Sequence, residues 1–254
     1  SDNISDTDIA SYKTKKTDEF HYSIPLDEDE TSKLSANIVN DFVEHSYFIL
    51  KNHPINRQRA EKKLMPANII LTRDAGAEFK EIEKLPGKWA AVLSMPLEKG
   101  IAKLTGMQVY PIAYPELKNY DVYLNLYASL SATIFNAQKC IIKGMRKYDY
   151  FYVHFKETDI PGHDDKPQDK KKMLEIIDTN FFGFLRQLAE KEKFKIVVTA
   201  DHSTPCNMKM HCSDAVPVLV YGMEKDSAQR FTEKESKTGS LGEIDSRDII
   251  KAVL

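Results

Sequence analysis

Five residues of this chain have side chains that commonly bind divalent cations. They are Asp159 and His163, which flank Ile-Pro-Gly, the adjacent pair Asp201 and His202, and His211. Carboxylate oxygen combined with imidazole nitrogen suits Mn²⁺, Zn²⁺ or Fe²⁺, whereas sets made of oxygen alone suit Mg²⁺ or Ca²⁺. We expect one ion to be bound by Asp159, His163 and His211. A second ion would be bound by Asp201 and His202 and would need further ligands. Two ions about 3.5–4 Å apart can hold a transferring phosphoryl group and activate its nucleophile.

Each of these signals has an ordinary structural explanation when it stands alone. An Asp-His dipeptide often forms a helix cap or a turn, and a single His near a strand end is commonly a hydrogen-bonded structural residue. The order along the chain favours a metal site instead. Two of the segments follow predicted strands, at 148–155 and 195–199, and His211 precedes a third, at 216–221. Ligands of open α/β sheets bind at the carboxyl ends of the strands, where these side chains would meet.

The elements that must position these residues alternate between strand and helix in the second part of the chain. The predicted strands are 90–95, 107–113, 148–155, 195–199 and 216–221, and the predicted helices are 98–105, 127–146, 168–191 and 247–254. The helix at 168–191 carries an apolar face, made of Met173, Ile176, Ile177, Phe181, Phe184, Leu185 and Leu188. The run KIVVT (195–199) lacks alternation, as expected of a buried parallel strand. This order predicts an α/β layered domain with a mostly parallel sheet.

The first part of the chain has a different pattern. Apolar residues at helical spacing, among them Ile38 and Phe42, predict a helix over 34–51, and a short basic helix is expected at 56–63. The β-rich run NIILT (68–72) predicts a strand. Pro86-Gly87 is the best candidate for a hinge, which divides the chain into domains 1–85 and 86–254.

Composition excludes several classes of protein. The 254 residues carry a net charge of −2, so nucleic acid is not an expected partner. We find no apolar run of the roughly 18 residues that a membrane helix needs. An odd number of cysteines, three, argues against a secreted disulfide scaffold and for a cytoplasmic protein. The polar beginning, without Met, suggests a piece of a longer chain.

The motifs around these residues are similar to those of a known family. They are TDIPGHDD (158–165), VVTADHSTPC (197–206), HCSDAVPVLV (211–220) and FTEKESKTGSLG (231–242), with 52–76 and 95–107 upstream. The chain resembles the archaeal-type 2,3-bisphosphoglycerate-independent phosphoglycerate mutases of the alkaline phosphatase superfamily. The resemblance covers essentially the whole chain. Asp165 departs from the pattern, because a Gly is expected there.

The resemblance implies an isomerase that interconverts 3-phosphoglycerate and 2-phosphoglycerate, in glycolysis and gluconeogenesis, through a phosphoserine. It implies two divalent ions, with Mn²⁺ expected and Mg²⁺, Co²⁺ or Zn²⁺ as alternatives, and no 2,3-bisphosphoglycerate. It also implies an alkaline-phosphatase-like sheet with helices on both faces, in domain 86–254. Domain 1–85 would then be part of a smaller α+β insertion domain that holds the substrate.

The family's nucleophilic Ser and one further metal ligand come from an N-terminal segment, and no Ser of this chain lies in the matching motif. We therefore expect the chain alone to be inactive. The N-terminal segment would be its natural partner, and an exposed apolar sheet surface would allow self-association.

The substrate carries a carboxylate and a phosphate, which require Arg or Lys. Arg73 is the first candidate, followed by Arg59 and Lys99, although each has an ordinary explanation as a surface cation. Lys156, near the metal loop, is a candidate for a phosphoryl oxygen. Two other functions remain open: another phosphatase or phosphomutase of the superfamily, and a metal-binding module without catalysis.

Overall fold

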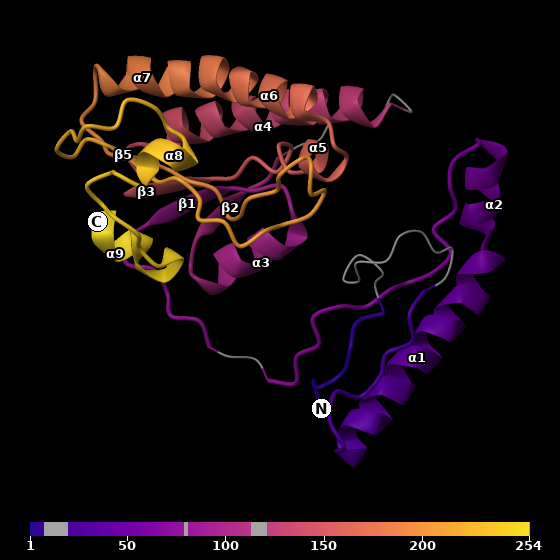
Figure 1. The fold of residues 1–254 in the computed structure, drawn as a ribbon. Coiled ribbons are helices and arrows are strands. Elements are labelled where there is room, and N and C mark those ends of the chain that lie inside the picture. Colours follow the sequence, from indigo (N-terminus) through magenta and orange to yellow (C-terminus); the bar gives the residue numbers. More distant parts are fainter. Residues whose placement is uncertain (8–19, 79–80, 113–120, 254) are drawn as a thin grey trace. The chain divides into compact units, whose positions relative to one another are not determined.

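The computed structural model describes residues 1–7, 20–78, 81–112 and 121–253. They form two compact units, Ser1–Glu81 and Ile82–Leu254, each of which has its own helices in Figure 1. Two predicted elements end beyond the described residues, because Ala113 and Leu254 lie outside them. Within the described part of the chain, no helix is both long enough and apolar enough to cross a membrane.

The first unit is built on two helices, α1 (Glu30–Lys51) and α2 (Pro54–Glu61). The side chain of Asp29 caps α1 by accepting a hydrogen bond from the Thr31 amide. His53 caps α2 in the same way, and Pro54 occupies its first turn, where a missing N–H costs nothing. Both helices therefore begin earlier than the apolar periodicity alone predicts.

The apolar residues that predicted α1 are exposed, and the helix buries a different face. Ile38 and Phe42 are 58% and 49% exposed, whereas the residues it buries are Ser32, Ala36, Val43 and Ser46. The buried face is used for hydrogen bonding as well as packing. For example, the Ser46 hydroxyl accepts from the amide of Ile70 at 3.2 Å.

The prediction of a strand at 68–72 is wrong: these residues, all of them described, form no strand. Side chains replace the partner strand as acceptors for its amides. The Ile70 amide donates to Oγ of Ser46 at 3.2 Å, and the Thr72 amide donates to Oγ1 of Thr7 at 2.8 Å. The run therefore forms hydrogen bonds with side chains, one of them on α1, instead of pairing in a sheet.

The second unit contains a parallel sheet with helices on both faces (Figure 1). Its strands are β1 (Trp89–Val92), β2 (Gln108–Tyr110) and β3 (Tyr150–Val153), in the order β2-β1-β3. Residues of β1 alternate between two cores, as period-2 geometry requires. Ala90 and Val92 pack in a core with helix α4 (Val122–Gly144), whereas Ala91 packs on the opposite side with Ala102 of α3 (Pro96–Leu104).

The predicted helix at 168–191 is present, but it is interrupted. It consists of α6 (Pro167–Ile176), a π-helical segment (Ile177–Phe182) and α7 (Gly183–Ala189). Its predicted apolar face is confirmed: four of the seven residues are buried in the larger core and the other three pack against it. The face buries Met173 completely, so this helix forms one wall of the layer that covers the sheet.

The expectation of a buried parallel strand at 195–199 is wrong. β4 (Ile196–Val198) pairs antiparallel with β5 (Leu219–Tyr221), and Val197 is 37% exposed. A parallel return requires a crossover, usually a helix. The connection from 199 to 218 contains no helix, and the chain therefore returns in the opposite direction. The remaining elements are the short α5 (Ile160–His163) and α8 (Glu233–Ser236), a 3-10 turn (Ser246–Asp248) and α9 (Ile249–Val253).

Candidate metal centre

Asp159 and His163 are brought together by the single turn of α5 that follows strand β3. Asp159 is the N-cap of α5, and its carbonyl accepts from the amide of His163 at 3.2 Å. Residues four apart lie on the same face of a helix, so the two side chains point to the same place. Nε2 of His163 lies 3.5 Å from Oδ2 of Asp159.

His211 reaches the same place from a distant part of the sequence. An isolated antiparallel bridge joins Ser203 to Cys212, whose amide donates to the Ser203 carbonyl at 3.1 Å. This bridge places His211 beside His202, with ring centroids 3.6 Å apart in a stacked arrangement. The segments 201–203 and 211–212 therefore form one ligand-bearing loop pair.

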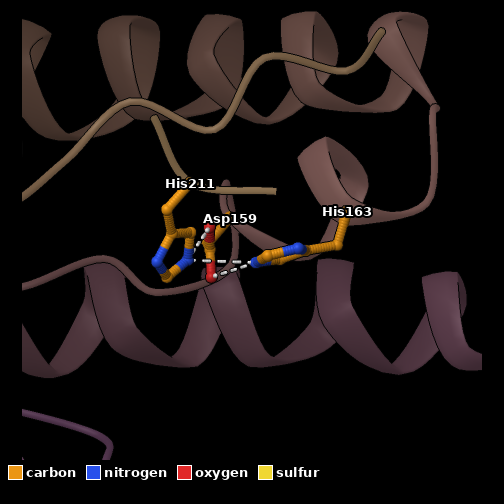
Figure 2. Close-up of side chains that lie close together, drawn as sticks. All are labelled: Asp159, His163 and His211. Carbon is orange, nitrogen blue, oxygen red and sulfur yellow. Dashed lines mark hydrogen bonds and ion pairs between the residues drawn. The ribbon is translucent and has the colours of Figure 1, made fainter. Parts of the chain in front are cut away.

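Asp159, His163 and His211 form a group of three ligand atoms, which we call the first ligand set. The three atoms all lie within 4.8 Å of one another. Nε2 of His211 is 3.6 Å from Oδ1 of Asp159 and 3.1 Å from Nε2 of His163. Figure 2 shows the two imidazole rings pointing toward each other and toward the Asp159 carboxylate. Tetrahedral ligands about 2.0–2.1 Å from Zn²⁺ lie about 3.4 Å apart, so these separations match a common ion.

The imidazoles also have suitable hydrogen-bond partners. Nδ1 of His163 lies 3.1 Å from the carbonyl of Lys209, which can only accept, so Nδ1 is the nitrogen that donates; in the neutral imidazole Nε2 then carries the lone pair. Nε2 of His211 faces that lone pair. Either His211 donates a proton across the gap, or a cation bound by both rings replaces it. A carbonyl behind a histidine is a usual means of orienting a metal ligand.

Asp201 and His202, the second ligand pair, contact each other closely. Nε2 of His202 lies 3.2 Å from Oδ2 of Asp201, whose side chain is 55% exposed. Within the described residues, the group of three ligands includes neither of them. The sequence prediction of five ligands in two sets stays a prediction, with three that converge and two that form a neighbouring pair.

The groups around the first ligand set favour an ionised Asp159 and a neutral His211. Burial opposes ionisation of Asp159, but hydrogen bonds from Thr204 and Lys156 and the nearby His163 outweigh it and lower its pKa to about 2. Burial, and then the neighbouring His202, lower the pKa of His211 below its ordinary value. At neutral pH, this gives one carboxylate charge and an imidazole that can offer a lone pair.

Thr204 is a residue of this centre that sequence reasoning missed. It is 4% exposed, and its hydroxyl donates to Oδ1 of Asp159 at 2.6 Å. The α5 turn packs directly on it: a Cβ added to Gly162 would lie 2.6 Å from the Thr204 carbonyl oxygen. A glycine in a one-turn helix beside two ligands was the signal for this contact, because only a residue without a side chain allows so close an approach.

Two hydrogen bonds from tyrosines of α4 hold the chain that follows His163. The hydroxyl of Tyr123 donates to Asp164 at 2.7 Å, and that of Tyr127 donates to Asp169 at 2.8 Å. These two bonds join the first turns of α4 to Asp164, just after α5, and to the first turn of α6. Together they fix the end of the α5 turn and the start of α6 against α4.

Asp165, the departure from the expected Gly, occupies a left-handed backbone conformation with φ of 55°. Glycine adopts this region freely, and Asp is among the few other residues that tolerate it. Its carboxylate lies 3.5 Å from Nζ of Lys209, the residue whose carbonyl orients His163. The Asp therefore gives an ion pair to the ligand-bearing loop and costs some backbone strain.

The predicted substrate contacts lie in different places. Nζ of Lys156 lies 3.0 Å from Oδ2 of Asp159, beside the first ligand set, and Lys99 lies on α3. Arg59 and Arg73 belong to the other unit, where Nε of Arg59 donates to the Met65 carbonyl and Nε of Arg73 pairs with Asp74. Their role as substrate contacts stays a prediction.

Comparison with known proteins gives consistent relatives. A 2,3-bisphosphoglycerate-independent phosphoglycerate mutase of Pyrococcus abyssi is 35% identical over 89% of this chain and 54% of its own length. A second relative is the 2,3-bisphosphoglycerate-independent phosphoglycerate mutase 1 of Archaeoglobus fulgidus, which is 33% identical. The match covers 100% of this chain and 59% of the relative's length. These relatives confirm the resemblance, and the chain spans about half the length of the curated relatives it matches.

The solved structure of the PH0037 protein from Pyrococcus horikoshii superimposes with a TM-score of 0.67 at 30% identity. The superposition covers 88% of this chain and 57% of the PH0037 chain, and it confirms the α/β fold class. The model of the metalloenzyme superfamily matches residues 94–253, a range that holds all five candidate ligands and implies the use of a metal ion. The chain therefore belongs to the metalloenzyme superfamily.

Proposed function

We propose that this chain is part of a metal-dependent phosphoglycerate mutase that interconverts 3-phosphoglycerate and 2-phosphoglycerate. The observation that supports this most is the convergence of Asp159, His163 and His211 at the end of a parallel strand. The names of the relatives supply the substrate class, since each is a mutase that works without 2,3-bisphosphoglycerate.

Two divalent ions would serve the reaction, with Mn²⁺ as the expected ion. The first ligand set would hold one, and the second ligand pair would contribute to the other. Bound ions would neutralise phosphoryl oxygens and favour an alkoxide nucleophile. The chain's own groups prepare this: Asp159 is kept ionised by its hydrogen bonds, and His163 is oriented by the Lys209 carbonyl.

Lys156 would add a positive charge at the edge of the centre. Its ammonium lies 3.0 Å from Asp159 and its side chain is partly exposed, so it can exchange that partner for an anionic phosphoryl oxygen. Positioning and electrostatic stabilisation of this kind account for most of the catalysis of phosphoryl transfer.

The phosphoryl group would pass through a phosphoserine whose Ser is not in the motifs of this chain. The chain alone is then inactive, and it needs the segment that carries the Ser and one more metal ligand. In this proposal, domain 1–85 contributes to holding the glycerate, and 86–254 forms part of the phosphatase-like domain. The three free cysteines support a cytoplasmic location.

The test compares two proteins under one assay. The longer parent protein and this 254-residue chain are incubated with 3-phosphoglycerate and Mn²⁺, without 2,3-bisphosphoglycerate, and phosphorus NMR follows the appearance of 2-phosphoglycerate. The parent is expected to interconvert the two, and an Asp159→Asn parent is expected to do so far more slowly. Turnover by this chain alone would contradict the missing-nucleophile proposal. Release of inorganic phosphate as the main product would favour a phosphatase.

A further inference from the structure

The hydroxyl of Thr204 lies between the first ligand set and the second ligand pair. On one side Oγ1 is 2.6 Å from Oδ1 of Asp159, and on the other it is 3.1 Å from Nδ1 of His202. The residue is buried, so water does not compete for either contact. One oxygen atom therefore joins the two groups of candidate ligands.

Counting protons gives the direction of both bonds. The Thr204 hydroxyl has a single proton, and its short contact with Oδ1 of the Asp159 carboxylate is the one to which it donates that proton. Oγ1 can then only accept from His202, which requires a proton on Nδ1. A neutral His202 with that proton has its lone pair on Nε2.

This lone pair faces another acceptor. Nε2 of His202 lies 3.2 Å from Oδ2 of Asp201, so an imidazole lone pair and a carboxylate oxygen share one small space. Two acceptors at this distance are stabilised by a cation between or beside them. Without the Thr204 hydroxyl, His202 would gain more by placing its proton on Nε2 and donating it to Asp201. That hydrogen bond would occupy Nε2 of His202 and Oδ2 of Asp201, the two atoms that would otherwise bind a cation.

The backbone of Thr204 is fixed from two directions. Nζ of Lys170 donates to its carbonyl at 2.7 Å, and the α5 turn packs against the same carbonyl at Gly162. The hydroxyl is therefore held at its position by groups that are not ligands themselves. This makes it a defined part of the centre instead of a side chain that happens to be near.

We propose that Thr204 is a positioning residue that couples the two groups of ligands. Its hydroxyl selects the Nδ1–H tautomer of His202, which leaves Nε2 free for a cation, and it orients the Asp159 carboxylate toward the first ion. The proposal rests on the proposed function, because both groups are taken as cation ligands. It assigns a role to a residue that does not touch an ion itself.

The tautomer of His202 is the most direct readout. Long-range ¹H–¹⁵N NMR of the imidazole rings, at about pH 8 where ordinary histidines are neutral, distinguishes Nδ1–H from Nε2–H. Wild type and Thr204→Ser are expected to show Nδ1–H at His202, whereas Thr204→Val and Thr204→Ala are expected to show Nε2–H. Thr105→Val is the matched control, because Thr105 is also buried and its hydroxyl donates to the Ile101 carbonyl at 2.9 Å.

Titration calorimetry with Mn²⁺ gives the second readout. Loss of a group that orients a metal ligand typically weakens metal binding about 10- to 100-fold, which is the expectation for Thr204→Val and Thr204→Ala. Thr204→Ser and Thr105→Val are expected to bind as wild type does. Circular dichroism of each variant shows whether it is folded, and the Ala variant replaces the Val variant if the latter is not.

The outcomes separate this inference from the proposed function. Nδ1–H retained in both variants without the hydroxyl, or a Ser variant that behaves as they do, would overturn the role of Thr204. A wild-type chain that binds no Mn²⁺ would overturn the proposed metal centre, while the tautomer comparison would still decide what the hydroxyl does.

Discussion

The first ligand set and the second ligand pair lie beside each other, yet they differ in how they are built. The first combines a turn after β3 with a loop far along the sequence, and three donor atoms converge there. The second consists of two adjacent residues after β4, with a single close contact between their side chains. A complete ligand set therefore requires that separate segments be brought together, and adjacency in sequence does not supply it. On this chain, we expect the first set to bind an ion by itself and the second pair to need another ligand.

Loss of the Asp159 carboxylate, which both histidines of the first ligand set contact, should have the largest effect. Asp159→Asn removes the one carboxylate of the first set, and we expect Mn²⁺ affinity to fall about 100-fold or more, equivalent to about 2.8 kcal/mol. Calorimetric titration of the chain measures this. Asp178→Asn, an exposed carboxylate of the π-helical segment, is the matched control. Binding of the Asp159 variant with wild-type affinity would exclude this residue as a ligand.

Ion binding should also stabilise the fold. A free Mn²⁺ concentration about 100-fold above Kd is expected to raise the free energy of unfolding by about 2.7 kcal/mol. Urea denaturation with Mn²⁺ and after addition of EDTA measures the difference. His163→Ala should lose this stabilisation, whereas His202→Ala should keep most of it. Equal loss in both variants would mean that the two groups bind one ion together, and the comparison above would fail.

The second ligand pair should contribute little to the ion held by the first set. For Asp201→Asn in this chain, we expect Mn²⁺ affinity to change by less than about threefold, or about 0.7 kcal/mol. The same calorimetric titration tests this expectation. In the longer parent protein the variant should lower turnover strongly, because there the pair would have its remaining ligand. A large effect on binding in the short chain would show that the pair already works without it.

The smallest effect is expected at Asp165. Replacing it with Gly relieves its left-handed backbone and removes an exposed ion pair with Lys209, which contributes little. The net gain in unfolding free energy is expected to be about 0.5 kcal/mol, with unchanged Mn²⁺ affinity. Thermal unfolding followed by circular dichroism measures it. A loss of affinity would show that the Lys209 loop depends on this ion pair to orient His163.

The sequence predicted the elements of the second unit well, because its helices and strands bury the faces that their patterns mark. Met173 and Leu185 lie in the core as their spacing indicates. The same reasoning misjudged α1, where Ile38 and Phe42 are exposed. An amphipathic pattern predicts that a helix has an apolar face, but it does not say what covers that face.

Two features of the centre could not be derived from local pattern. The pairing direction of β4 depends on the path of the connection 199–218 to β5. The composition of the strand does not encode that path. The contact of Thr204 with Asp159 joins residues 45 apart and uses an ordinary hydroxyl. By contrast, the convergence of Asp159 and His163 was predictable because their spacing matches one helical turn.

The separation of His211 from the α5 turn also bears on the order of folding. Asp159 and His163 come together within one turn, whereas the contact between His163 and His211 spans 48 residues and depends on the bridge between Ser203 and Cys212 that places His211. Contacts of such long range form late, after the loop between them has closed. An ion held by all three residues would then stabilise the native state more than the folding transition state. It would slow the opening of the domain and leave the rate of its formation almost unchanged.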